Sequence, residues 1–143
     1  MLDVYHPVIM SEWGVGNIIS ISKLAAKVYA TYQDAPDNYK HISVSEGVMS
    51  LQSMIDTTAQ HFESTPFSDN DLQECQEVLK GCENVLKGLN SFFKKKNGPA
   101  STHTSQVHKR VQPGAEDITT LKARLMSSTI LLNSFIQRFE FIL

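Results

Sequence analysis

Apolar residues recur every three or four positions in four long segments of the chain, the spacing typical of one face of an α-helix. The third segment, about 69–96, shows this pattern most clearly, and Ser68 before it is a good N-cap residue. Its apolar stripe is broad enough to need burial by more than one neighbouring helix. The stripe consists of Leu72, Cys75, Val78, Leu79, Cys82, Val85, Leu86, Leu89, Phe92 and Phe93.

Three further segments carry stripes of the same kind, at about 15–33, 37–64 and 116–143. Proline and glycine separate the segments, and a polar loop at 97–115 precedes the last one. Gly47 makes the second helix the weakest prediction, since glycine inside a helix costs roughly 1 kcal/mol relative to alanine. The stripes are Ile18, Ile21, Leu24, Ala25, Val28 and Tyr32; Val44, Val48, Leu51, Ile55 and Phe62; and Ile118, Leu121, Leu125, Leu132, Phe135, Phe139 and Ile142.

Four amphipathic helices of this length predict an all-α fold, an antiparallel up-and-down bundle with a longer polar loop before the last helix. The heptad spacing of the third and fourth helices favours crossing angles near 20°. We expect one domain over 13–143, preceded by an N-terminal extension over 1–12.

Composition excludes several classes of protein. Apolar residues make up 41% and charged residues 20% of 143 residues, which is typical of a globular chain. The chain contains no run of eighteen apolar residues, so the sequence predicts no membrane-spanning helix. The N-terminus lacks the pattern of a signal peptide. We therefore expect a cytoplasmic protein.

The formal net charge of −2 is unevenly distributed along the chain. Residues 1–93 hold five Lys/Arg and twelve Asp/Glu, whereas residues 94–143 hold eight and three. Pairing between the two halves explains this asymmetry as well as an acidic or lipid partner does. An overall acidic domain argues against nucleic acid as a partner.

No pattern of reactive residues predicts catalysis, a cofactor or a metal. Gly14-Val15-Gly16-Asn17 lacks the third glycine and the preceding strand of a dinucleotide-binding loop, and it is better explained as a helix start. Cys75 and Cys82 are seven residues apart, about 10 Å along one helix, so we expect them to be buried and unpaired. The five histidines show no spacing typical of a metal site. They are His6, His41, His61, His103 and His108.

Two features are candidates for an interaction surface. The fourth helix carries more apolar residues than one stripe needs, and Leu131 and Ile136 are the candidates for exposed apolar surface. The run Lys94, Lys95 and Lys96 either interacts with the negative end of its helix dipole or contacts anionic lipid.

The order of several short motifs resembles a known family. Trp13-Gly14-Val15-Gly16-Asn17-Ile18-Ile19-Ser20-Ile21-Ser22-Lys23-Leu24-Ala25 is followed by Asp34-Ala35-Pro36, by Gly81-Cys82-Glu83-Asn84-Val85-Leu86, and by Glu116-Asp117-Ile118 with Leu121-Lys122-Ala123-Arg124-Leu125. This series is similar to the fungal N-terminal domain of STAND proteins, the NOD-like receptors that carry NACHT or ankyrin modules, and to the wider HeLo-like class. The resemblance spans about residues 13–137.

The resemblance implies a helical signalling or cell-death module without enzymatic activity. Such a module would associate with further copies of itself or with other helical domains, without a cofactor or a small-molecule substrate. The alternative implied by the same family is a membrane-active effector that becomes membrane-associated on activation and binds anionic lipid through basic and apolar helix surfaces.

Overall fold

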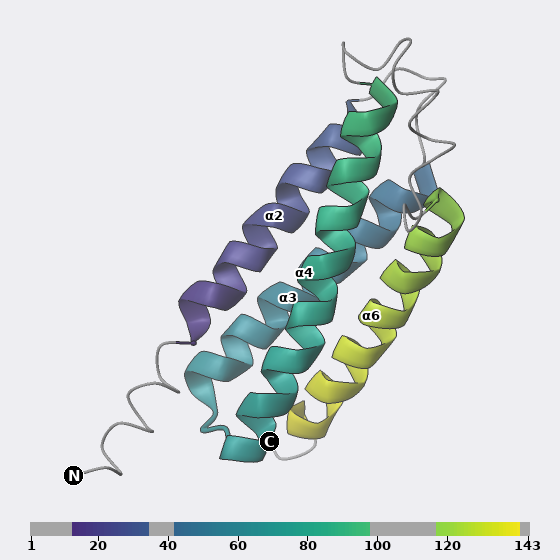
Figure 1. The fold of residues 1–143 in the computed structure, drawn as a ribbon. Coiled ribbons are helices and arrows are strands. Elements are labelled where there is room, and N and C mark those ends of the chain that lie inside the picture. Colours follow the sequence, from purple (N-terminus) through teal and green to yellow (C-terminus); the bar gives the residue numbers. More distant parts are fainter. Residues whose placement is uncertain (1–12, 35–41, 98–116, 141–143) are drawn as a thin grey trace, which may run out of the picture.

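The computed structural model describes residues 13–34, 42–97 and 117–140, and these ranges contain four helices (Figure 1). These are α2 (Val15–Gln33), α3 (Ile42–Ser64), α4 (Asp69–Asn97) and α6 (Ile118–Glu140). No strand occurs in these three ranges. The prediction of an all-α bundle of four main helices is confirmed. Residues 1–12, 35–41, 98–116 and 141–143 lie outside the described residues, and with them most of the predicted polar loop and N-terminal extension.

The helices alternate in direction along the chain (Figure 1). Around the bundle the order is α2, α3, α6 and α4, because α2 and α6 each pack against both α3 and α4. The consecutive helices α3 and α4 touch only marginally and therefore lie on a diagonal, with α3 passing behind α4 in Figure 1. The short link 65–68 makes this diagonal connection.

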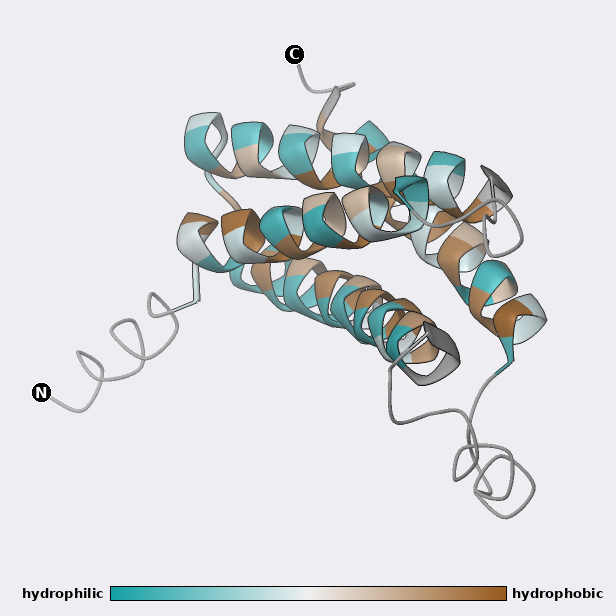
Figure 2. Ribbon diagram, turned by 90° about the horizontal axis from the view of Figure 1, so that it is seen from above, coloured by the Kyte–Doolittle hydropathy of each residue, from teal (hydrophilic) through white to brown (hydrophobic). Residues whose placement is uncertain are grey.

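The apolar stripes meet in one core, and Figure 2 shows the hydrophobic residues turned toward the inside of the bundle. From Cys75 to Leu89, the stripe of α4 is fully buried at its steps of three and four. The hydroxyl of Tyr32 in α2 donates a hydrogen bond of 2.7 Å to the carbonyl oxygen of Leu89 in α4, which satisfies its one polar atom inside the core. The buried apolar residues are Ile18, Ile21, Ala25, Val28, Tyr32, Val44, Val48, Leu51, Ile55, Cys75, Leu79, Cys82, Val85, Leu86, Leu89, Leu121, Leu125, Leu132, Phe135, Ile136 and Phe139.

Polar side chains mark three of the helix starts. The backbone N–H of Asp71 donates to Ser68 Oγ at 3.1 Å, as expected for the predicted cap of α4. At α6 the N–H of Thr120 donates to Asp117 Oδ1 at 2.8 Å, and hydrogen bonds from Thr120 lower the pKa of this carboxyl. Helix α6 therefore begins at Ile118, two residues after the boundary estimated from the sequence, because Asp117 is its cap. The Asn17 side chain accepts a hydrogen bond from the Gly14 N–H at 2.9 Å, so Gly14 to Asn17 form a helix start.

Gly47 of α3 lies against Leu125 of α6. A Cβ built on Gly47 would lie 2.7 Å from Leu125 Cδ2, closer than carbon atoms approach without a clash. Leu125 is itself buried. The glycine that weakens the helix prediction is thus explained by packing, since its missing side chain makes room for α6.

We expect Gly47→Ala and Gly81→Ala to change stability in opposite directions. A Cβ at Gly81, in the middle of α4, meets nothing within 4 Å, so Gly81→Ala should raise the free energy of unfolding by about 0.5–1 kcal/mol through helix propensity. Gly47→Ala must displace Leu125 and should lower it by about 1 kcal/mol or more. Urea unfolding followed by circular dichroism measures both; equal stabilisation by the two substitutions would contradict the close contact.

Candidate interaction surface

The outward side of α6 carries three large apolar side chains. Met126 is 67% exposed, and Ile130 and Leu131 are each 59% exposed. Between Ala123 and Gln137 the charged residue is Arg124, which is half-buried and lies two turns before Leu131 on the same flank. The other exposed residues in this stretch are Ala123, Ser127, Asn133, Ser134 and Gln137. Large exposed apolar side chains close together on one helix are typical of a surface that binds a partner.

The three apolar side chains point in two directions. Met126 and Ile130 are one helical turn apart and share the outer face. Leu131 lies about 100° further around the helix. It is on the same side as Arg138, two turns on, whose guanidinium pairs with Asp71 at 3.4 Å and Glu74 at 3.0 Å on α4. Leu131 therefore flanks α4, whereas Met126 lies on the side of α3.

Ile136 is not part of this surface, and its assignment as exposed apolar surface is wrong. Its side chain is only 3% exposed. Ile136 follows the buried Leu132 by one turn, so both side chains point into the core. Leu131, the other apolar candidate, is exposed as expected.

The basic candidates lie away from the apolar surface. Lys94 is exposed near the end of α4; the side chains of Lys95 and Lys96 lie outside the described residues. Glu74, which pairs with Arg138, precedes Lys94 by a rise of about 30 Å along α4. Leu131 lies within about 10 Å of Arg138 along α6. The structure therefore does not bring Lys94 and Leu131 into one site.

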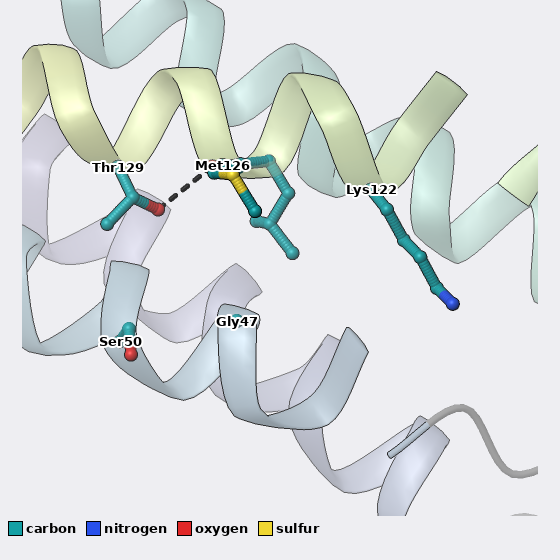
Figure 3. Close-up of a pocket in the computed structure, with 6 residues that line it drawn as sticks. Gly47, Ser50, Lys122, Met126 and Thr129 are labelled. Carbon is teal, nitrogen blue, oxygen red and sulfur yellow. Dashed lines mark hydrogen bonds between the residues drawn. The ribbon is translucent and has the colours of Figure 1, made fainter. Parts of the chain in front are cut away.

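A groove of about 280 Å³ runs between α3 and α6 beside Met126 (Figure 3). Its lining is mainly apolar, and one side opens to solvent. Met126 and Lys122 project from α6 toward α3, where Gly47 and Ser50 line the other side of the groove (Figure 3). The lining residues are Gly47, Ser50, Lys122, Leu125, Met126 and Thr129.

Aromatic rings close the end of the bundle where α3 ends and α6 ends. The ring of Phe67, in the link before α4, stacks on Phe139 at 4.7 Å and meets Phe135 and Phe62 edge-on. The guanidinium carbon of Arg138 lies 5.0 Å from the centre of the Phe135 ring, a cation–π distance. From the sequence, Pro66 indicates only a break between two helices. The signal in the sequence for the packing of Phe67 against α6 was a large aromatic residue directly after Pro66, in a short link between two helices.

The cysteines and histidines of the described residues lie apart from one another, and each has its own surroundings. No group of three His, Cys, Asp or Glu residues lies close enough to hold a metal in the described part of the chain. Burial raises the pKa of both Cys75 and Cys82 to about 12, so these thiols are poor nucleophiles. His61 lies beside the Phe139 ring, at 6.4 Å, while His6, His41, His103 and His108 are outside the described residues.

Searches of protein-family models, curated proteins and solved structures find no match to this chain. Within residues 13–34, 42–97 and 117–140, no helix has the length and apolar character needed to cross a membrane.

Proposed function

We propose that this chain is a non-enzymatic signalling or protein-interaction domain that acts by self-association of helix faces. The observation that carries the proposal is the exposure of three large apolar side chains of α6, Met126, Ile130 and Leu131, each more than half exposed. These side chains take no part in the core, so covering them with another protein surface gains hydrophobic free energy at little cost to the bundle.

The resemblance of the sequence to the N-terminal module of fungal NOD-like receptors supports the same proposal. A module that is brought together by a larger receptor needs only weak self-affinity, because tethering raises its effective concentration. The alternative within that family, binding of anionic lipid by a cell-death effector, depends on Lys94, Lys95 and Lys96.

Sedimentation velocity over a concentration range up to about 1 mM tests self-association, since 1 mM corresponds to about −4.1 kcal/mol of binding free energy. We expect the mean sedimentation coefficient to rise with concentration. A constant monomer value throughout would contradict the proposal. Flotation with vesicles containing anionic lipid, at low and high salt, tests the alternative; salt-sensitive binding that is lost in Lys94→Gln would favour lipid.

A further inference from the structure

Helices α2 and α3 pack side by side and carry charges of opposite sign. Helix α2 contains two lysines, Lys23 and Lys27, and neither aspartate nor glutamate. Helix α3 contains Glu46, Asp56 and Glu63, and neither lysine nor arginine. All five side chains are exposed. The side of the bundle that these two helices form is therefore basic along one half and acidic along the other.

The exposed residues of this side form one stripe on each helix, because they recur at steps of three and four. The hydroxyl of Ser22 in α2 donates a hydrogen bond of 2.5 Å to Asp56 Oδ1 in α3, so the two stripes adjoin. We call the two stripes together the α2–α3 face. They consist of Ile19, Lys23, Ala26 and Ala30 on α2, and of Glu46, Met49, Ser53, Asp56, Gln60 and Glu63 on α3.

The contact between Ser22 and Asp56 also determines which residues of the two helices lie at the same level. The helices run in opposite directions (Figure 1). Met49 precedes Asp56 by two turns of α3, so it lies close to the level of Ala30, about two turns after Ser22 in α2. Met49 is 50% exposed. A protruding methionine therefore lies at the level of a small residue on the neighbouring helix.

We infer that two copies of this chain pair through the α2–α3 face, about a two-fold axis parallel to the helices. Helix α2 of each copy then lies opposite α3 of the other, at the same level, and each contact occurs twice. Lys23 of each copy faces Asp56 of the other, and Met49 of each copy faces Ala30 of the other. This inference rests on the self-association proposed above and adds a second surface, which does not include α6.

The pattern of charge favours a second copy as the occupant. A partner of one sign, such as an anionic membrane, would attract α2 and be repelled by α3, whereas a second copy matches both helices. Charge also selects the orientation, because a two-fold axis across the helices would place α2 against α2 and lysines against lysines. The ion pairs within the described residues join residues of α4 and α6. Lys23 and Lys27 take part in none of them.

The size of the face agrees with a dimer. Helix α2 rises about 28 Å over its 19 residues, and two adjacent helices are together about 20 Å wide. A flat face of this size has an area of about 560 Å². Protruding side chains raise its accessible area toward the about 800 Å² per partner that stable complexes bury.

Reversal of single charges in the full chain tests the pairing. Lys23→Glu places a carboxylate opposite Asp56 twice in each dimer, and it should raise the dissociation constant, measured by sedimentation, at least about tenfold. Lys80→Glu makes the same change of charge at an exposed position of α4 and should change the constant by less than about twofold. Thermal unfolding shows that each variant is folded. The wild-type dimer should also weaken as salt is raised, because salt screens exposed charges.

Mixing two charge-reversed chains tests which residues face each other. Asp56→Lys alone should weaken the dimer as Lys23→Glu does, since lysine then faces lysine. An equal mixture of the two variants should pair about as tightly as the wild type, because both contacts of the mixed dimer again join opposite charges. A mixture of Lys23→Glu with Glu77→Lys, a matched reversal on α4, should show no such recovery. If Asp56→Lys does not fold, Lys23→Glu against Lys80→Glu still decides the inference.

The outcomes separate this inference from the proposed function. A wild-type chain that stays monomeric overturns both. A wild-type chain that associates, with Lys23→Glu as strong as Lys80→Glu, overturns the α2–α3 pairing and leaves self-association to another surface. Met126→Glu alters only the α6 surface, so the dimer should survive it. Loss of all association in Met126→Glu would therefore overturn the α2–α3 pairing while supporting the proposed function.

Discussion

Replacing Phe135 with alanine should lower the free energy of unfolding by about 3–5 kcal/mol, the usual cost of truncating a buried phenylalanine. Phe135 is 2% exposed, and its ring contacts those of Phe67 and Phe139. The substitution removes the ring that joins the α6 core to the link before α4. It also removes one of the two rings under the Arg138 guanidinium. Urea unfolding followed by far-ultraviolet circular dichroism measures the change.

Two control substitutions test whether the loss of stability comes from removing the Phe135 ring and not from any substitution in α6. Phe135→Leu keeps most of the apolar volume and should cost clearly less than Phe135→Ala. Ile130→Ala, on the exposed face of the same helix, should stay within about 0.5 kcal/mol of the wild type at low concentration. A Phe135→Ala variant that loses under about 1 kcal/mol would show that the aromatic rings do not anchor this end of the bundle.

The folded state should lose stability steeply above pH 9. Burial raises the pKa of Cys75 and Cys82 from 9.0 to about 12, and that of Tyr32 from 10.0 to about 12. Between these values the unfolded chain releases protons that the folded chain keeps, so the free energy of unfolding falls as pH rises. The stabilisation is fully present below pH 9 and is lost as the pH approaches 12. Denaturant unfolding at half-unit steps from pH 7 to pH 11 measures the slope.

A Cys75→Ala, Cys82→Ala double variant is the control for the alkaline effect. It is less stable at pH 7 because two buried sulfur atoms are removed. Its stability should nevertheless fall less between pH 9 and pH 10, because the thiols, with an ordinary pKa of 9.0, ionise in the unfolded chain at lower pH than Tyr32, whose ordinary pKa is 10.0. If the free energy of unfolding fell equally with pH in the variant and the wild type, the thiols would not be the cause of the alkaline loss of stability. A thiol reagent should also react slowly with both cysteines in the folded protein, since both are buried.

The existence of the helices and the direction of their apolar faces followed from the sequence. Each helix encodes its own apolar stripe locally, and the stripe of α4 from Cys75 to Leu89 is buried as its spacing predicts. The Ser68 cap was also predictable, because capping depends on residues within one turn. The same local pattern identified Leu131 as surplus apolar surface.

The tertiary structure alone decided which flank of each helix is covered. Ile136 and Leu131 are both apolar and both beside the main stripe of α6, yet only Ile136 is buried. The outcome depends on the order of helices around the bundle, in which α3 and α4 lie on a diagonal and α6 packs against both. That order also decides that Gly47 meets Leu125 and that Phe67 stacks on Phe139. Periodicity reports how one helix divides its faces between core and solvent, whereas contacts between residues far apart in sequence depend on where its neighbours lie.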